Sequence, residues 1–333
     1  MQGGTRRIMR KTVHLCLSSH QEVMYRSEAD LNMGFNCLAL AVMETESRLL
    51  GEGFMTTHNH KLVQTENPAE LVRRERYAYS RYFNAKYSRR GGLGERQCFS
   101  LEVIGTCHLQ TALNYVLRQG LHHGLAATPF GYPHCSANSF FRKELGKDHP
   151  PSLMSTGGQY KYLPHGKSMP GGCRMSAQGL ILREDVLDTV LVEQLYITPR
   201  NFLFQMNRFT DEKIVQEQMQ ENDSPPVTLD SIENGVNGFD LKAALVSEGG
   251  RVNNSFLTDL ELCRIIDEKY LPHFLLRGVK GTVYTLSHSR RADLGNALWK
   301  DVKLGPARGR PYSEGLFVGR KVTVEQIRRC LAL

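Results

Sequence analysis

Two short stretches carry residue types that could bind a cation and attack a phosphodiester. His58 and His60 lie in a run of strand-forming residues from 54 to 63. Side chains at i and i+2 of a strand share a face, so both imidazoles should point the same way and hold one divalent cation. Tyr115 and Gln119 lie four residues apart in a helical stretch over 109–119, so their side chains share one face of that helix. Packed together, two imidazoles, an amide oxygen and a phenol would form a metal site with a nucleophile beside it.

The composition favours a globular protein with a polyanionic partner. The chain has 333 residues, enough for two domains, and 42 Lys+Arg against 34 Asp+Glu give a net charge of +8. The eight cysteines form no Cys-x-x-Cys pair, so they predict neither a zinc ribbon nor a disulfide framework but reduced thiols in a cytoplasmic protein. The sequence has no long apolar run of the kind that would indicate a signal peptide or a membrane span. It also lacks a Gly-x-x-x-x-Gly-Lys loop, so no nucleotide cofactor is expected.

The periodicity of the first half alternates between strand and helix. The elements are expected in this order: strand 12–18, a helix from a Ser27 cap to Val42, a strand from Arg48 to Val63, helix 68–89 after an Asn67 cap, a strand-like or irregular piece to about Ile104, and the helix with Tyr115, which stops at Gly120. This order predicts an α+β fold, an antiparallel sheet with helices on one face.

The second half is expected to be mostly helical. A Pro- and Gly-rich stretch from 148 to 175 is typical of a linker, and Asn222–Pro226 is a second break. We therefore expect a first domain over 1–147, a linker and helical extension over 148–225, and a basic helical region over 226–333. Thr323 and Gln326 form a capping box before the last helix. The basic helices fit either a helix-turn-helix-like DNA-binding unit or a charged, solvated bundle.

Helix 68–89 combines aromatic and basic residues. Its tyrosines and Phe83 repeat at helical spacing, so we assign them mainly to the core, although aromatic faces can also stack on bases. We assign the basic residues of this helix and of the segment after it mainly to DNA binding: Arg73, Arg74, Arg76, Arg81, Lys86, Arg89, Arg90 and Arg96.

In their order and spacing these motifs resemble the single-tyrosine HUH transposases, most closely the REP-associated tyrosine transposases. The resemblance covers about residues 12–141. It is carried by the following stretches: His58-x-His60, Tyr79–Tyr87, Arg90–Leu93, Leu113–Tyr115, Gly124-Leu125 and Tyr132–Ser136.

The resemblance implies a ferredoxin-like HUH domain that cleaves and rejoins single-stranded DNA at hairpin-bearing sites. Carried over by position, His58 and His60 are metal ligands, Gln119 is the third ligand, and Tyr115 attacks DNA and keeps a 5′-phosphotyrosine. The implied cofactor is Mg²⁺ or Mn²⁺, and the implied partner is single-stranded or hairpin DNA bound by a monomer or homodimer.

Several positions depart from the family pattern. Asn59 replaces the usual apolar residue between the two histidines, which is expected to weaken packing behind the sheet. Gly94 and Gln97 stand where an aromatic and an arginine are usual, a change expected to alter DNA contacts. The stretch from Gln119 to Gly124 also differs. Because each catalytic position keeps a workable residue, an active transposase-like endonuclease is favoured over a non-catalytic, domesticated hairpin-binding protein; a replication initiator or relaxase would need a helicase module or second active tyrosine.

Overall fold

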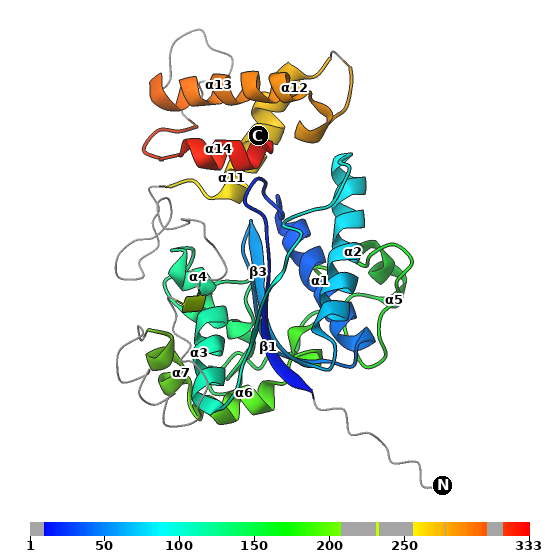
Figure 1. The fold of residues 1–333 in the computed structure, drawn as a ribbon, viewed down its shortest axis with the longest axis vertical. Coiled ribbons are helices and arrows are strands. Elements are labelled where there is room, and N and C mark those ends of the chain that lie inside the picture. The colour runs from blue at the N-terminus through cyan, green and yellow to red at the C-terminus, as the bar shows by residue number, and fades with distance from the viewer. Residues whose placement is uncertain (1–9, 208–230, 233–255, 277, 305–315) are drawn as a thin grey trace.

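The structure is a computed structural model that describes residues 10–207, 231–232, 256–276, 278–304 and 316–333. The predicted break at Asn222–Pro226 lies outside these ranges. An α+β body is joined to a small group of C-terminal helices, which lie beyond one end of the sheet (Figure 1). No helix in the described part of the chain is long and apolar enough to cross a membrane.

The body contains a four-stranded antiparallel sheet, which confirms the predicted α+β class. Its strands are β1 (Lys11–Ser18), β2 (Arg48–Phe54), β3 (His58–Thr65) and β4 (Phe99–Glu102), arranged in the order β2-β3-β1-β4. The two central strands, β1 and β3, are almost entirely buried. Their register sets Cys16 opposite His60 and Ser18 opposite His58.

One predicted strand is two strands in the structure. The sequence predicted a single strand from Arg48 to Val63, but the chain turns back after Phe54 and forms the β2–β3 hairpin. The Met55 N–H donates to the His58 carbonyl at 2.8 Å, and the His58 N–H donates back at 3.4 Å. The turn itself is Thr56-Thr57. Hairpin turns are usually marked by Asn or Gly, and neither is present here, so the turn left no sequence signal.

Helices cover both faces of the sheet rather than one. Helices α1 (Glu28–Glu44) and α2 (Pro68–Tyr87) pack together on the first face, and the predicted caps Ser27 and Asn67 accept the expected backbone hydrogen bonds. Helix α3 (Thr106–Leu117) lies on the opposite face (Figure 1). The alternation of β3 shows this directly, because Asn59 contacts Glu75 of α2 whereas His60 contacts Tyr115 of α3. The expectation of helices on one face is therefore wrong for α3.

The described part of the region predicted as a linker and helical extension contributes side chains to the core of the body. Side chains of Leu163, Ile181 and Phe202 are buried in the same hydrophobic cluster as the strands. Short elements carry this part and the segment before it: α4 (Gln119–His122), η1 (Pro129–Gly131), η2 (Ser136–Ser139), α5 (Thr156–Gln159), η3 (Tyr160–Tyr162), η4 (Arg183–Asp185), α6 (Thr189–Tyr196) and α7 (Pro199–Met206). Within the Pro- and Gly-rich stretch 148–175 most residues are exposed, and Leu163 and Met175 are the hydrophobic side chains that it buries.

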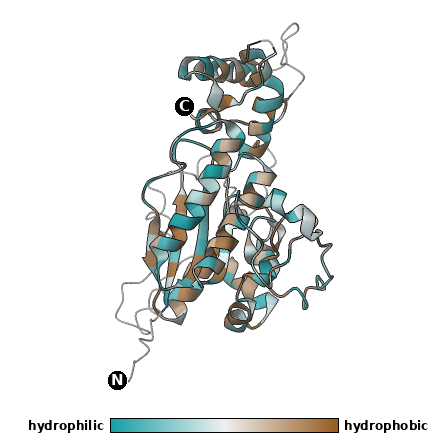
Figure 2. Cartoon of the chain, turned by 90° about the vertical axis from the view of Figure 1, so that its right-hand side faces the viewer, coloured by the Kyte–Doolittle hydropathy of each residue, from teal (hydrophilic) through white to brown (hydrophobic). Residues whose placement is uncertain are grey.

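The C-terminal helices enclose a second hydrophobic cluster. They are α11 (Asp259–Ile265), η5 (Ile266–Tyr270), α12 (Leu271–Phe274), η6 (Val283–Thr285), α13 (His288–Leu304) and α14 (Val324–Leu331). The predicted Thr323–Gln326 capping box is present. Arg26 joins this unit to the body, because its guanidinium donates to the Cys330 carbonyl and pairs with Asp267 at 2.9 Å. Hydrophilic residues predominate in α2 and α13, whereas the strands contain brown hydrophobic segments beside teal ones (Figure 2).

Candidate functional site

The two histidines of β3 lie on one face and have fixed ring orientations. Their ring centroids are 4.9 Å apart. His58 Nδ1 lies 3.0 Å from the Thr57 hydroxyl, and His60 Nδ1 lies 3.1 Å from Nε2 of His14 on the neighbouring strand. Nε2 of His60 is buried and has no hydrogen-bond partner in the structure. Both rings are therefore oriented through Nδ1, and in His60 this leaves Nε2 available to a ligand.

Tyr115 lies beside the histidines, on the inner side of α3. Its ring centroid is 5.1 Å from that of His60 and 5.8 Å from that of His14. The side chain is 4% exposed and packs with Cys16 and Ile232 in a small cluster. The phenol therefore lies beside the imidazoles, and its ring packs against Cys16 and Ile232.

Gln119 also reaches the site, although it does not continue the helix of Tyr115. The sequence predicted one helix through both residues, whereas α3 ends at Leu117 and Arg118 breaks it with a ψ of 4°. Short helix α4 then starts at Gln119. The amide Nε2 donates to the Tyr115 carbonyl at 3.0 Å, and Oε1 lies 3.2 Å from His123 Nε2. Gln119 is also a hydrogen-bond partner of His58. The break thus turns the amide oxygen toward two imidazoles.

Sequence reasoning missed two histidines of this cluster. His14 supports His60, and His123 lies against both Gln119 and the His58 ring, whose centroid is 5.5 Å away. Both had a signal in the sequence. Strand 12–18 was predicted, and its alternation places His14 and Cys16 on one face. His123 follows Gln119 at a spacing of four, which is one helical turn.

A divalent cation at this cluster would need at least three protein ligands. In the described ranges, no group of three or more His, Cys, Asp or Glu side chains is arranged to hold a metal ion. A site here would therefore need the amide oxygen of Gln119 as its third protein ligand. The orphaned, buried Nε2 of His60 fits such a site, because a buried nitrogen without a partner is costly unless a ligand binds it. Rings oriented through their second nitrogen are the usual arrangement around bound metals.

Burial keeps the site histidines neutral. Burial lowers the pKa of His58 to about 4, and burial together with the nearby Lys61 charge lowers that of His14 to about 3. The pKa values of His60 and His123 are lowered well below their usual range, again mainly by burial and then by the neighbouring imidazoles. Neutral imidazole is the form that binds metals, so the cluster is ready to act as ligand at neutral pH.

The same pKa shifts predict acid sensitivity. An unfolded histidine titrates near pH 6.5, so between about pH 6.5 and 4 the unfolded chain binds more protons than the folded one, and stability falls as pH falls. We expect a loss of about 1 kcal/mol for each such histidine between pH 7.5 and 5.5. Urea denaturation followed by circular dichroism across this range measures it. In His14→Asn the free energy of unfolding should fall by about 1 kcal/mol less over this pH range than in the wild type. An equal fall in both proteins would contradict the prediction.

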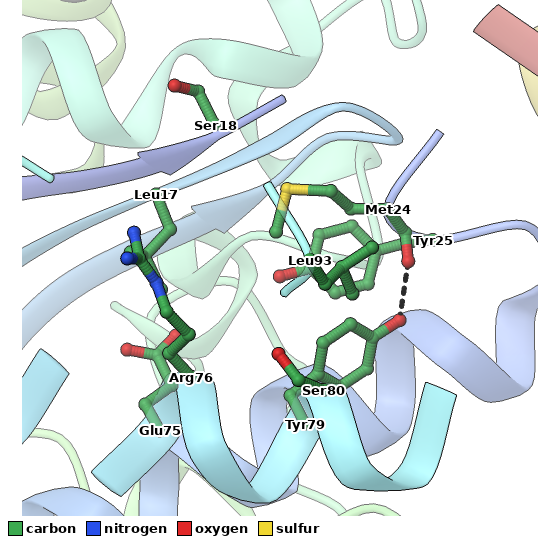
Figure 3. Close-up of a pocket in the computed structure, with 10 residues that line it drawn as sticks. Leu17, Ser18, Met24, Tyr25, Glu75, Arg76, Tyr79, Ser80 and Leu93 are labelled. Carbon is green, nitrogen blue, oxygen red and sulfur yellow. Dashed lines mark hydrogen bonds between the residues drawn. The ribbon is translucent and has the colours of Figure 1, made fainter. Parts of the chain in front are cut away.

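The opposite face of β3 carries a buried polar network. Asn59 donates to the Tyr25 hydroxyl at 2.7 Å and to Glu75 at 3.0 Å, and Lys61 donates to Asn59 at 2.6 Å and pairs with Glu75 at 2.8 Å. Glu75, Tyr25 and Tyr79 lie beside a small pocket between α2 and the sheet (Figure 3). The sequence predicted that Asn59 would weaken packing here. Instead, its amide is fully engaged, so the polar residue is accommodated by polar partners.

The eight predicted DNA-binding residues lie on α2 and the segment after it, across the sheet from Tyr115. Several form ion pairs within the protein: Arg73 with Glu70, Arg74 with Glu44 and Glu70, Lys86 with Asp30, and Arg89 with Glu22. Arg76 donates to the Arg96 carbonyl, and Arg81 lies 5.5 Å from the Tyr77 ring centre. The exposed members are Arg73, Arg81, Lys86, Arg90 and Arg96.

Comparison with known proteins gives little further information. No protein-family model and no curated protein matches the sequence. One solved structure with a similar arrangement is a REP-associated tyrosine transposase bound to a REP hairpin; it is 9% identical, with a TM-score of 0.35, and the match covers 45% of this chain and 89% of that one. A similarity this distant carries no functional argument, so the assignment rests on the residues of the site.

Proposed function

We propose that this protein is a metal-dependent single-strand DNA transesterase of the tyrosine HUH type, which acts at hairpin-bearing sites. The observation that carries the proposal is the cluster itself: two oriented imidazoles, a buried amide and one phenol on a single face of the sheet. The order β1–α1–β2–β3–α2–β4, with sheet order β2-β3-β1-β4, supports a ferredoxin-like HUH domain.

In this proposal His58, His60 and Gln119 hold Mg²⁺ or Mn²⁺. A bound cation would polarise a non-bridging phosphate oxygen and offset the charge that develops on it. Nitrogen ligands suit Mn²⁺ better than Mg²⁺, which prefers oxygen. His14 and Thr57 hold the two imidazoles in place through Nδ1. These residues therefore pre-organise the ligand set before DNA arrives.

Tyr115 is the nucleophile of the proposed reaction. Its oxygen forms a bond to phosphorus as the bond to the 3′ oxygen breaks, so that the phenol loses a proton and the 3′ oxygen gains one. The 5′-phosphotyrosine conserves the bond energy for rejoining, and no nucleotide cofactor is needed. Because the ring is 4% exposed and contacts Ile232, this contact has to open before a phosphate can reach the oxygen.

DNA binding is assigned to the basic side chains of α2 and the segment after it. Exposed arginines and Lys86 neutralise phosphates, which supports a single-stranded or hairpin partner. The chemistry lies on the other face of the sheet, so the bound strand has to pass an edge of the sheet to reach Tyr115. The basic C-terminal helices remain a proposed second contact with hairpin DNA.

The decisive experiment is trapping of a covalent adduct. Full-length protein is incubated with Mn²⁺ and a labelled single strand that carries a hairpin, and the adduct is separated on a denaturing gel. We expect a metal-dependent adduct that Tyr115→Phe abolishes and Tyr77→Phe, which alters an exposed tyrosine, retains. An adduct that persists in Tyr115→Phe would rule out this nucleophile.

The burial of Tyr115 favours one alternative, a non-catalytic hairpin-binding protein with the same fold. In that case hairpin strands would bind with the same affinity to the protein and to Tyr115→Phe, and no adduct would form with Mn²⁺ or Mg²⁺. The same gel, together with fluorescence anisotropy, separates the two functions.

A further inference from the structure

A cavity of about 230 Å³ opens beside the histidine cluster, between the body and the C-terminal helices. His58 and His123 form its inner wall. Thr258, Leu260 and Arg329 close it from the C-terminal side, so both parts of the protein build it. The Thr56 hydroxyl donates to Asp259 at 2.8 Å, which fixes the turn of the β2–β3 hairpin against the start of α11. The cavity is thus a continuation of the proposed active site.

The charges that line this cavity are already paired with one another. Glu28 is hydrogen-bonded to His134, and Arg329 lies 3.5 Å from Asp259. A phosphate placed here would meet two carboxylates, which disfavours an anionic ligand. The remaining wall is mostly apolar and includes Leu125. This lining suits an uncharged ring that carries hydrogen-bond donors and acceptors at its edge.

The volume of the cavity limits the size of the ligand that it can hold. Pockets for drug-sized molecules usually enclose roughly 300–1,000 Å³, so 230 Å³ is suited to one ring system and too small for a hairpin or several nucleotides. Enzymes that act on nucleic acid commonly take a single base out of the stack and hold it between apolar side chains.

We propose that this cavity binds one unstacked nucleobase of the DNA strand, next to the phosphate held at His58 and His60. The inference rests on the proposed function and extends it, because it makes the C-terminal helices part of the binding site. Leu260 and Arg329 would then help to select the base beside the cleavage point.

Two substitutions, one on each wall, fill the cavity and test the inference. Leu260→Trp and Leu125→Trp place a ring where the base would lie, and Leu276→Trp, at an exposed leucine of the C-terminal unit, is the matched control. Binding is measured by fluorescence anisotropy with full-length protein, Mn²⁺ and two labelled single strands of equal length. One strand carries bases throughout, and the other consists of abasic sugar-phosphate units only.

We expect both cavity-filling variants to bind the base-bearing strand at least tenfold more weakly than the wild type, with unchanged affinity for the abasic strand. Leu276→Trp should match the wild type on both strands. Equal weakening on the two strands would mean that the cavity holds backbone phosphate. Unchanged binding of the base-bearing strand by both variants would show that no base enters the cavity. Either result overturns this inference and leaves the proposed function standing.

Failure of the wild type to bind any single strand overturns the proposed function together with this inference, whereas base-dependent binding without a covalent adduct removes only the catalytic assignment. Thermal melting of each variant identifies one that has not folded. Since the two substitutions lie on opposite walls, the loss of one still leaves the other as a complete test.

Discussion

Replacing Lys61 with methionine is expected to lower the free energy of unfolding by about 3–5 kcal/mol. The ammonium of Lys61 is fully buried and pairs with the Glu75 carboxylate, whose side chain is 2% exposed. Methionine has a similar length and fills the same space, so the cost comes from the carboxylate, which stays buried without its counter-ion. Urea denaturation followed by circular dichroism gives the difference, provided that both proteins unfold in a single transition.

Two further variants identify the cause of this loss. In the double variant Lys61→Met/Glu75→Leu no charge is left uncompensated, and most of the stability should return. Lys11→Met removes another lysine–carboxylate pair, with Glu102, in which the side chains are 59% and 47% exposed, and should change stability by less than about 1 kcal/mol. If Lys61→Met costs no more than Lys11→Met, the buried pair contributes nothing particular to the fold.

This network shows where sequence reasoning reaches its limit. The strand alternation correctly separates His58 and His60 from the residue between them, since alternation is a property of the strand alone. It gives no indication that Asn59 would meet Glu75 and Lys61, because that contact depends on how α2 lies across the sheet. Asn59 was therefore interpreted as an isolated departure, although it belongs to a set of polar residues that compensate for one another.

Local signals predicted the elements better than the connections. The caps at Ser27, Asn67 and Thr323 are all present, since capping depends on a few neighbouring residues. The β2–β3 turn and the helix break at Arg118 were missed, because neither contains the Gly, Asn or Pro that usually marks such a change. Tertiary contacts lie at both places: Thr56 of the turn donates to Asp259, and the Leu117 carbonyl at the end of α3 accepts from the Cys135 thiol.

The candidate site was predicted in part for the same reason. His58, His60, Tyr115 and Gln119 do lie together, while their roles as ligands and nucleophile stay predictions. His14 and His123 each had a local signal, but their place in the site depends on tertiary packing, in which His14 meets His60 and His123 meets Gln119. Ile232 could not be foreseen, because its contact with Tyr115 joins residues more than a hundred positions apart along the chain.

Loss of His60 is expected to have the largest effect on activity of any imidazole substitution. His60→Ala removes a proposed ligand and the ring next to Tyr115, so the rate of Mn²⁺-dependent adduct formation should fall by about 100-fold or more at every Mn²⁺ concentration. His14→Ala should behave differently, because the hydrogen bond of His14 goes to Nδ1 of the ligand ring and leaves the proposed ligand atom in place. It should weaken the apparent affinity for Mn²⁺ by about 10–100-fold and leave much of the rate at saturating metal.

A titration of adduct formation against Mn²⁺ distinguishes these two behaviours. The exposed His165→Ala provides the control and should reproduce the wild-type curve. A His14→Ala curve that is lowered at every concentration, with its midpoint unchanged, would mean that His14 does not act through the metal. A His60→Ala curve that rises to the wild-type plateau would mean that His60 is dispensable for the chemistry, and the cation would then have to be held by His58, Gln119 and DNA. The hydrogen bond between His14 and His60 thus predicts a shift in midpoint for one histidine and a loss of plateau for the other, a contrast that loss of folded protein would not produce.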